Sequence, residues 1–596
     1  MSDLYHQYNL RADASREKEV FYNRRLRLVS LLRLLFFVAM LVLPFYLLPV
    51  MFLAGIILPL VFLILFLFSI KYYQRLLAKR QLERFRILIN EQEMNALEHR
   101  FDVFDDGAEM IDPHHFNTYD LDVFGKGSLF QYIDRTVTRA GKKCLGDMLQ
   151  EPMLNADDIV ARQKLIGEMA RSLDWRQHFL ARGMMYDEEA HETSLLQGFQ
   201  NEQFHLRTLP FVSILLLVLP LFSLAGLLFW IFKGSSALLV LAGLVQFVLW
   251  LLERKNIQNI YSRFGKRVKL LQKYSELLSL VESFDWQSGE GRRMYESLKE
   301  SGLPSNEFRQ LVKIVSAYDN RNNLLIGIFL NLFLMWDIRY SYLLIQWHER
   351  NKENYGKWSA TLALIDALVS LANFACNHPD FAWPEPVADS FEIVSAQMGH
   401  PLIHPQKRIN NDFHFLQQNK VMIITGANMA GKSTFLRTVG VNMLLAMAGA
   451  PVCAASMRFK PLVVFSNMRT TDSLFDDESY FFAELKRIKT FLDELEQGRE
   501  LLIILDEILK GTNSADKLSG SQQLVRRLVQ YDAHVIIATH DLKLTEIEKE
   551  FPEKVLNRCF EIEIRDDEMH FDYQLRNGIT TVMNATFLMK KMGIIA

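Results

Sequence analysis

Cysteine is scarce in this sequence, and no two cysteines have the spacing of a metal site. The 4 cysteines among 596 residues stand far apart, at Cys144, Cys376, Cys453 and Cys559. Such scattering argues against a disulfide scaffold and fits a reducing compartment. The formal net charge of −2 rules out a globally basic nucleic-acid coat, but it is compatible with a local basic face. The length predicts three or four domains, at roughly 150 residues each.

Charged side chains are missing from a long stretch near the N-terminus. Residues 34–70 are 37 residues without one charge, whereas a single membrane span needs about 20 apolar residues. We therefore expect a transmembrane hairpin that turns near Pro44–Pro49. Residues 11–33 contain 7 lysines and arginines, residues 71–86 contain 6 and the turn contains none, so both ends should face the cytoplasm. A pair of buried soluble helices is the alternative, and the run is too long for a cleaved signal peptide.

A second uncharged stretch has the same form. Residues 208–232 and 237–252 are apolar, and a short polar break at Lys233–Ser236 separates them, which predicts a second transmembrane hairpin. The basic stretch Arg254–Lys273 follows; it could contact phosphates or anionic lipid heads, or it could be a solvated helix face. The apolar segment Asn322–Trp336 has only 15 residues, so we expect a core helix there.

A phosphate-binding loop stands between a strand and a helix in the C-terminal third. The strand Val421–Thr425 runs into a G-x-x-x-x-G-K-S pattern. Its glycines let backbone N–H groups point at phosphate oxygens, and the following helix N-terminus adds a positive dipole. Lys432 should reach the β and γ phosphates and the Ser433 hydroxyl should sit on Mg²⁺, so ATP and Mg²⁺ are the predicted cofactors. The predicted nucleotide-binding residues of this loop are Gly426, Ala427, Asn428, Met429, Ala430, Gly431, Lys432, Ser433 and Thr434.

Two further strand ends carry residues that suit ATP hydrolysis. The strand 501–505 ends in Asp506 and Glu507. In a parallel sheet such carboxylates lie beside the phosphate loop, where Asp506 can hold Mg²⁺ and Glu507 can orient or deprotonate the attacking water. The strand 534–538 leads to His540, which is either a sensor of the γ-phosphate or only a polar strand end.

Together these strands predict an ABC-like ATPase sheet. Such ATPases usually work in pairs, because a signature segment from one subunit closes the site of the other. Ser479 is the candidate serine of that segment, although a serine at the start of a helix can also be only an N-cap.

These motifs resemble those of the MutS mismatch-repair ATPase family. Thr425–Thr434 reads T-G-A-N-M-A-G-K-S-T and Asp506–Asn513 reads D-E-I-L-K-G-T-N, similar to the family's T-G-P-N-M-G-G-K-S-T and D-E-I-G-R-G-T-S. Asp472–Leu485 resembles the family's signature helix, with Ser479 at its serine. Shorter similarities are Gly125–Leu129, Asp134–Thr138, Arg162–Gln163, Gly399–Pro401 and Ala538–His540.

The sequence also departs from the family pattern. The family's mismatch reader carries a Phe-x-Glu wedge in an N-terminal domain, whereas the triplets Phe482–Glu484 and Phe551–Glu553 lie in the ATPase region. Asp477, Tyr480 and Leu509 replace residues that are usual in the family's motifs. The resemblance therefore implies a paired ATPase, but not mismatch recognition by that wedge.

The expected fold is an α/β ABC-like P-loop ATPase domain plus a largely α-helical core domain with two transmembrane helical hairpins. The expected segments are a cytoplasmic basic leader (1–33), the first hairpin (34–70), a helical linker (71–117), the first part of a MutS-like core domain (118–207), the second hairpin (208–252), a helical lever and core return (253–385) and a MutS-type ATPase domain (386–596).

The resemblance implies a membrane-anchored MutS-like ATPase that hydrolyses ATP, forms a homodimer and binds DNA in mismatch repair or recombination. The apolar stretches imply a multi-pass protein of the inner (cytoplasmic) membrane, with the lipid bilayer as a partner and the ATPase domain in the cytoplasm. The rival hypothesis is a membrane ATPase that drives a partner protein without binding DNA. A substrate transporter is disfavoured, because the predicted spans contain few polar groups.

Overall fold

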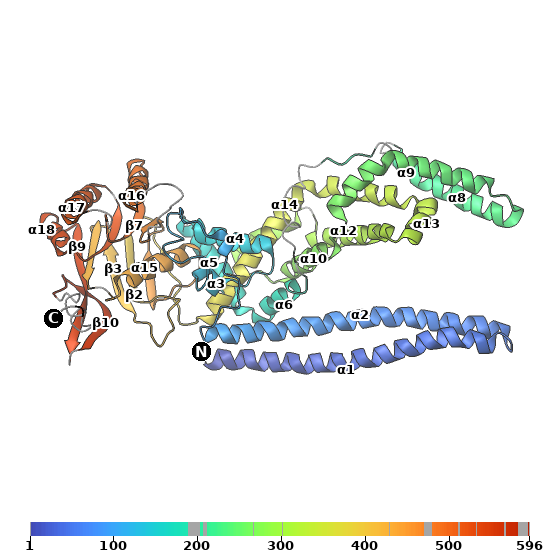
Figure 1. Ribbon diagram of the computed structural model, residues 1–596, viewed down its shortest axis with the longest axis horizontal. Helices are drawn as coiled ribbons and strands as arrows, with labels where there is room; N and C mark the ends of the chain where they lie inside the picture. The colour runs from blue at the N-terminus through green and yellow to red at the C-terminus, as the bar shows by residue number, and fades with distance from the viewer. Residues whose placement is uncertain are drawn as a thin grey trace.

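The computed structural model shows an elongated molecule with a head at one end, two helical arms at the other and a helical body between them (Figure 1). It describes residues 2–186, 188, 203–206, 211–265, 267–300, 302–427, 429–469, 480–509, 513–531, 533–565, 568–581 and 594. Both arms extend from the body in the same direction, away from the head.

The head is built on a six-stranded sheet with the strand order β10-β9-β4-β8-β7-β6. Its strands are β4 (Val421–Gly426), β6 (Val463–Asn467), β7 (Leu501–Asp506), β8 (His534–Thr539), β9 (Val555–Arg565) and β10 (Glu568–Asn577). Neighbouring strands are parallel except β9 and β10. Parallel strands need crossover connections, which here place helices on both faces of the sheet.

Alternate side chains of β4 show how the two faces are covered. Met422 and Ile424 belong to the apolar cluster that includes α15 (Lys432–Met447). Val421 and Ile423 point the other way, into a cluster with α16 (Tyr480–Glu496) and α17 (Ser514–Gln530). This two-sided burial explains why the strand is apolar at every position up to Thr425.

A second, smaller sheet completes the head, with the order β1-β5-β2-β3. Its strands are β1 (Glu385–Pro386), β2 (Glu392–Met398), β3 (Asn411–Leu416) and β5 (Ser456–Phe459); the short helices η4 (Leu542–Glu546) and α18 (Ile547–Glu550) precede β9. The mixed α/β head and the largely helical remainder confirm the predicted combination of an α/β domain with a helical core.

The body packs short helices around α14 (Trp336–Asn377), which runs from the second arm to the head. The other helices of the body are η1 (Ala108–Met110), α3 (Leu129–Ile133), α4 (Arg139–Gln150), α5 (Ala156–Arg171), α6 (Leu173–Gly183), α10 (Val268–Ser283), α11 (Gly289–Lys299), α12 (Pro304–Tyr318) and η3 (Asp319–Asn322). Asp366 of α14 is buried and accepts hydrogen bonds from the Thr138 N–H at 2.8 Å and the Thr138 hydroxyl at 2.6 Å. A Cβ on Gly141 would lie 2.2 Å from this carboxylate, so glycine permits the close approach of α4.

The first arm is a hairpin of two 46-residue helices, α1 (Ser2–Leu47) and α2 (Phe52–Leu97). Neither helix breaks at residue 33 or residue 70, where the sequence predicts segment boundaries. The predicted turn lies close to the observed one, at residues 48–51. The two helices are therefore continuous from the body to the apolar tip.

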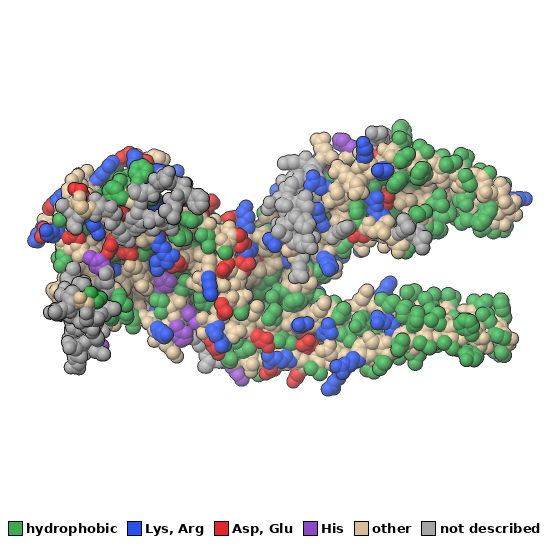
Figure 2. Space-filling view, viewed as in Figure 1, with side chains coloured by type: hydrophobic (Ala, Val, Ile, Leu, Met, Phe, Trp, Pro, Cys, Tyr) green, Lys and Arg blue, Asp and Glu red, His purple; other side chains and the backbone are tan. Residues whose placement is uncertain are grey.

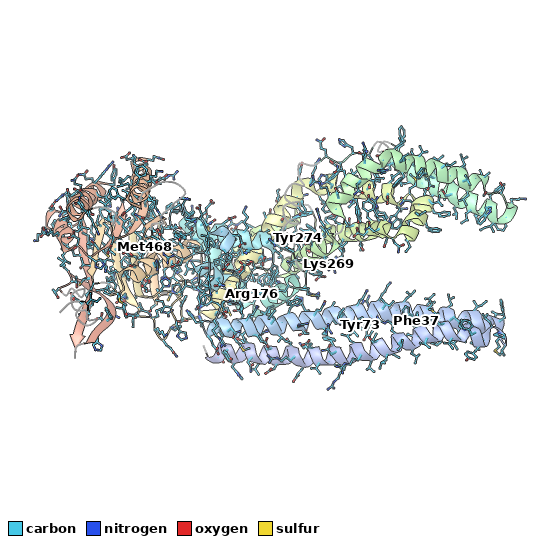
Figure 3. All side chains as sticks on the ribbon, in the orientation of Figure 1. Phe37, Tyr73, Arg176, Lys269, Tyr274 and Met468 are labelled. Atoms are coloured by element: carbon cyan, nitrogen blue, oxygen red, sulfur yellow. The ribbon has the colours of Figure 1, made fainter. Side chains whose placement is uncertain are left out.

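The base of the first arm is fixed to the body, whereas its far half is held mainly by contacts between its own two helices. Tyr8 donates a hydrogen bond to Asn377 at 2.8 Å, at the end of α14. Further out, the side chains of Phe37 and Tyr73 lie along the arm (Figure 3), and Phe37 packs against Phe66 at 5.8 Å between ring centroids. Apolar side chains near the tip face outward.

The second arm contains α8 (Val212–Lys233), α9 (Ala237–Phe264) and α13 (Leu324–Leu334). Gly234 ends α8 with a φ of 72°, which suits glycine and supports the turn into α9. The sequence predicts a buried core helix at Asn322–Trp336, and the prediction of burial is wrong. A helix does form there, but it packs against α8 and α9 and leaves Ile328 and Phe329 exposed.

Among the residues that the structure describes, five helices are long and apolar enough to cross a membrane, judged by length and composition. Burial separates them into two kinds. In α14 the most apolar window is 67% buried, whereas the windows in α1 and α2 are 6% buried and those in α8 and α9 are 17% buried. The helix α14 is therefore a core helix of the body, and the other four are the apolar helices of the two arms.

Candidate functional site

The phosphate loop follows β4 and leads directly into α15. Gly426 has a φ of 155° and Gly431 a φ of 105°, values that side chains disfavour. A Cβ on Gly426 would lie 2.9 Å from the Phe560 carbonyl oxygen, and one on Gly431 would lie 3.0 Å from the Tyr573 ring. The loop therefore depends on both glycines for its path beside β9 and β10. The predicted residue Asn428 lies outside the described residues.

Lys432, the first residue of α15, folds back onto its own loop. Its Nζ donates hydrogen bonds to the carbonyl oxygens of Gly426 at 2.7 Å and Ala427 at 2.9 Å. Burial lowers its pKa to about 8, against the opposing influence of Asp506 and Glu507. An ammonium group buried among neutral carbonyls gains from a nearby anion, so this position fits the phosphates of a nucleotide.

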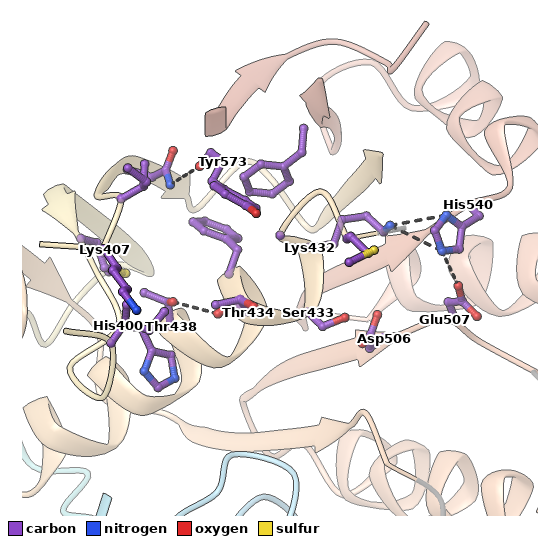
Figure 4. Close-up of a pocket in the computed structure, with 18 residues that line it drawn as sticks. His400, Lys407, Lys432, Ser433, Thr434, Thr438, Asp506, Glu507, His540 and Tyr573 are labelled. Atoms are coloured by element: carbon purple, nitrogen blue, oxygen red, sulfur yellow. Dashed lines mark hydrogen bonds and ion pairs between the residues drawn. The ribbon is translucent and has the colours of Figure 1, made fainter. Parts of the chain in front are cut away.

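The two carboxylates and the histidine meet beside this lysine (Figure 4). Asp506 ends β7 and pairs in register with Ala538 of β8. Glu507 follows with a φ of 57°, an uncommon conformation for a residue other than glycine. Its Oε1 lies 2.8 Å from His540 Nε2, and the ring nitrogens of His540 lie 3.4 and 3.5 Å from Lys432 Nζ. Residues from three segments of the sequence thus form one cluster.

This cluster lines one side of a cavity of about 630 Å³. Ser433 and Thr434 of the phosphate loop also line it, as do Met429 and Gly431. Other lining residues come from outside the motifs: Met398, His400, Ile403, Lys407, Ile409, Asn411, Phe435, Thr438, Phe560 and Tyr573. The volume and the mixture of a cationic loop with apolar walls suit a nucleotide.

Sequence reasoning missed most of the residues outside the motifs. His400 lies in the Gly399–Pro401 stretch that resembles the family, and burial lowers its pKa to about 4, so it is a neutral wall of the cavity. Tyr573 carries no motif. It reaches the cavity because β10 has an irregularity between Phe571 and Leu575, and because the Asn411 amide donates to the Tyr573 carbonyl at 3.0 Å. Such tertiary contacts leave no local signal.

The predicted signature serine, Ser479, lies outside the described residues, but the residues that flank its segment are held by one carboxylate. Asp120 is buried and accepts hydrogen bonds from the backbone N–H groups of Met468 at 3.2 Å and Arg469 at 2.8 Å. The Arg487 guanidinium of α16 lies 3.1 Å from the same carboxylate. Asp120 therefore joins Met468 and Arg469, which follow β6, to the helix α16.

A second carboxylate, Asp122, lies with Asp120 in the loop between η1 and α3, and it contacts α15, the helix that follows the phosphate loop. Asp122 pairs with Arg469 at 2.6 Å and lies 3.7 Å from Arg437 of α15. The Arg437 guanidinium also donates to the Asp120 carbonyl at 3.1 Å. The loop that contains Asp120 and Asp122 thus contacts both α15, through Arg437, and Arg469. Sequence reasoning did not identify either aspartate.

Comparison with known protein families identifies both large parts of the chain. Residues 422–588 match MutS domain V, and residues 116–372 match MutS domain III. The chain belongs to the MutS family. The domain V match covers the six-stranded sheet from Met422 onward and the cluster of Lys432, Asp506, Glu507 and His540, whereas the cavity residues between Met398 and Asn411 lie before it. The domain III match covers most of the body and includes the second arm.

Individual relatives carry MutS names. The DNA mismatch repair protein MutS of Thermotoga maritima is 31% identical over 235 residues, which are 39% of this chain and 29% of that protein. The human MutS protein homolog 4 is 31% identical over 238 residues, 38% of this chain and 25% of that protein. A MutS of Protochlamydia amoebophila is 33% identical over 229 residues, 37% of this chain and 26% of that protein. The chain thus aligns with less than a third of the length of these curated relatives.

Proposed function

We propose that this chain is a membrane-anchored MutS-family ATPase that binds and hydrolyses Mg²⁺–ATP, works as a homodimer and contacts DNA. The observation that carries the proposal is the cluster of Lys432, Asp506, Glu507 and His540 in one cavity of the head; all four residues lie in the domain V match. A phosphate loop with its lysine and carboxylates for Mg²⁺ and for the attacking water are the groups that ATP hydrolysis uses, and His540 lies beside them, directly after β8.

Different residues of the cavity would bind different parts of Mg²⁺–ATP. Lys432 exchanges its backbone carbonyl partners for phosphate oxygens, and the N–H groups at the start of α15 face the same charge. Ser433 and Asp506 both line the cavity, and we assign them to Mg²⁺, which would supply charge neutralisation on the β and γ phosphates. Apolar walls such as Ile409 and Phe560 suit the base of the nucleotide.

Glu507 orients or deprotonates the attacking water. In the structure His540 Nε2 lies 2.8 Å from the Glu507 carboxylate and near Lys432 Nζ, so the histidine connects the base to the phosphate-binding lysine. When Lys432 turns to a phosphate, His540 is the side chain best placed to respond. This arrangement supports its role as a sensor of the γ-phosphate.

The homodimer is proposed because a phosphate loop leaves one side of the γ-phosphate uncovered. A serine hydroxyl and a helix N-terminus from a second subunit can complete the site around the γ-phosphate. Ser479, just ahead of α16, is the residue that we assign to this contact.

Both arms support an anchor in the inner membrane. Hydrophobic side chains gather over the far parts of both arms, whereas charged side chains are frequent on the head, the body and the base of the first arm (Figure 2). Phe45 and Leu53 near the first tip and Phe232 near the second are 81%, 72% and 79% exposed. Exposure of so much apolar surface is unfavourable in water and favourable in a bilayer. Because both tips lie on the same side of the molecule, one bilayer can hold both, with the head in the cytoplasm.

DNA contact rests on family membership, since DNA mismatch repair is named for two of these relatives. One observation favours the rival function, an ATPase that drives a partner protein without DNA. The second arm extends from the domain III region, and its far end is apolar rather than basic. A salt series separates the two hypotheses, because phosphate contacts weaken steeply as salt rises.

The deciding experiment uses the full chain in lipid nanodiscs. We expect Lys432→Ala to weaken ATP binding about a hundredfold or more, because loss of one partner from a buried charged contact costs roughly 2–5 kcal/mol. Lys460→Ala is the matched control, since Lys460 pairs with Glu500 at the other end of the head's strands. Unchanged ATP binding and turnover in Lys432→Ala would contradict the assigned site. Absence of salt-dependent DNA binding in the intact protein would favour the rival function.

A further inference from the structure

A group of lysines and arginines lies on the first arm where its exposed apolar part begins. Residues 20–82 contain 8 basic side chains and no aspartate or glutamate. We call these residues the basic collar: Arg24, Arg25, Arg27, Arg33, Lys71, Arg75, Lys79 and Arg80. None of them lines the nucleotide cavity, so the collar is separate from that site.

Both helices contribute to the collar at the same level of the arm. Arg33 of α1 lies over the Tyr73 ring of α2 at 5.0 Å, and the Arg80 guanidinium donates to the Asn23 side-chain oxygen at 3.2 Å. These contacts place the two basic segments side by side. From Arg24 to Arg33 the collar extends about 14 Å along the arm, at about 1.5 Å per residue.

Most side chains of the collar point away from the contact between the two helices. Leu26 and Val29 of α1 and Leu76 of α2 fill that contact. Arg24 and Lys71 lie about 140° around their helices from Val29 and Leu76, respectively, and therefore on the outward faces. The exposed members of the collar are Arg24, Arg25, Arg27, Lys71, Arg75 and Lys79. Because the outward faces of two packed helices point in opposite directions, positive charge lies on both sides of the hairpin.

In the part of the chain that the structure describes, no carboxylate forms an ion pair with a collar side chain. Nearer the body, by contrast, the arginines of the same arm are paired: Arg11 with Asp174, Arg16 with Glu91 and Arg86 with Glu83. The collar therefore differs from the base of the arm in charge balance and not only in composition. Positive charges that no carboxylate compensates attract an anionic partner.

The collar borders the exposed apolar surface of the arm directly. Leu34 and Leu35 follow Arg33 in α1 and are exposed, and Phe68, just before the collar residues of α2, is exposed as well. Tyr72 is exposed at the level of the collar. Tyrosines and basic residues at the edge of an apolar surface are typical of the boundary between membrane and water.

We propose that the basic collar binds the phosphate groups of anionic phospholipids, such as phosphatidylglycerol, at the surface of the bilayer. The proposal rests on the membrane anchor proposed above and names the lipid chemistry that the anchor requires. Positive charge on both sides of the hairpin matches a surface that surrounds the arm, whereas a nucleic-acid duplex would contact one side. The adjoining apolar surface also favours lipid, because acyl chains cover it and a duplex does not.

The test measures which lipids lie next to the protein. The full chain is reconstituted in phosphatidylcholine vesicles that contain a minority of phosphatidylglycerol and a trace of spin-labelled lipid. The label is on phosphatidylglycerol in one sample and on phosphatidylcholine in the other, and electron paramagnetic resonance reports the fraction of each whose motion the protein slows. We expect phosphatidylglycerol to associate about threefold more strongly than phosphatidylcholine, and this preference to decrease as salt rises.

Two variants of the collar and a matched control make the test specific. The α1 variant combines Arg24→Gln, Arg25→Gln and Arg27→Gln, and the α2 variant combines Lys71→Gln, Arg75→Gln and Lys79→Gln. Each should weaken the preference, because charge remains on the other side of the hairpin, and the six changes together should abolish it. The control changes exposed residues at the base of the arm, Arg16→Gln, Lys18→Gln and Arg100→Gln, and should leave the preference unaltered. ATP turnover of each variant shows that the chain remains folded.

The possible results are distinct. Equal association of the two lipids with the wild type would overturn the proposal, and so would a preference that the six changes leave unaltered. If the wild type has no lipid preference and the six changes remove salt-dependent DNA binding, the collar is a nucleic-acid surface and the proposal is wrong.

Carbonate extraction separates the collar from the anchor on which it rests. If the protein resists extraction from pure phosphatidylcholine vesicles but shows no lipid preference, the anchor stands and only the collar assignment fails. If carbonate releases the protein, the anchor fails. The collar assignment then stands if the wild type still co-sediments with phosphatidylglycerol vesicles and the variant with six changes does not, and it fails if both or neither co-sediments.

Discussion

The strand β4 of the head and the far parts of the arms have similarly apolar sequences, yet their apolar side chains differ in burial. In β4 every residue from Val421 to Ile424 is fully buried, because helices cover both faces of the sheet. In the arms, apolar side chains such as Phe45 and Phe232 remain largely exposed. Apolar composition alone therefore does not determine whether a segment is buried in the protein. Burial depends on which other elements pack against the segment. The head provides its own cover, and the arms require another.

The largest effect should come from the arms. Replacing residues 34–70 and 208–252 with short soluble linkers should release the protein from the membrane completely, because burial of each exposed leucine or phenylalanine contributes roughly 1.5–3 kcal/mol. Vesicle flotation measures the release, and ATP affinity should persist, since the cavity is lined by residues of the head. A released protein that no longer binds ATP would show that the two regions are not separable.

The next effect is confined to the head. Glu507→Gln should slow ATP hydrolysis about 10²-fold, as expected for loss of a positioned base, while ATP binding and membrane association remain. Single-turnover kinetics in nanodiscs separates hydrolysis from binding. Glu546→Gln, close to the site in sequence but absent from the cavity lining, is the control. Wild-type turnover in Glu507→Gln would remove this carboxylate from the mechanism.

A smaller effect is expected where the body meets the head. Asp120→Asn preserves the shape of the side chain but removes the charge that faces Arg487. We expect turnover to fall about tenfold to thirtyfold, because a hydrogen bond to a charged group contributes about 1.5–3 kcal/mol. ATP affinity should change little, because Asp120 does not line the cavity. The exposed Asp112→Asn is the matched control. A parallel loss of ATP affinity would mean that Asp120 supports the phosphate loop instead.

The smallest effect is a pH dependence of ATP affinity. Burial lowers the Lys432 pKa to about 8, and bound phosphate would raise it again. Between about pH 8 and the higher bound-state pKa, binding takes up a proton, so ATP affinity should fall as pH rises, by up to about tenfold between pH 8 and pH 9. Calorimetry in buffers of different ionisation enthalpy measures the uptake. Lys432→Arg stays charged in this range and should not take up that proton.

The sequence predicted the head better than the arms. The phosphate loop, the strand end at Asp506 and the strand leading to His540 are local patterns, and the structure brings them together. The rest of the cavity could not be predicted, because Tyr573 and Ile409 arrive through tertiary contacts. In the arms, the uncharged runs indicated both hairpins but not the full length of their helices.

The wrong prediction at Asn322–Trp336 has a physical reason. The apolar segment has 15 residues, fewer than a membrane span needs, and for that reason alone a core helix was predicted. The structure instead places α13 against α8 and α9, so a helix too short to span by itself shares their apolar surroundings. Length excludes an independent span, but it does not exclude an accessory helix beside one.

The continuity of α14 has a mechanical consequence. Its 42 residues begin at Trp336, where the helix packs against α9 and α13 of the second arm, and end at Asn377, which contacts the base of the first arm. At about 1.5 Å per residue such a helix is about 60 Å long, so a tilt of about 5° at one end displaces the other by about 5 Å, close to one helical pitch. A small reorientation of the head would therefore reach the apolar helices of the second arm as a shift of nearly one helical pitch.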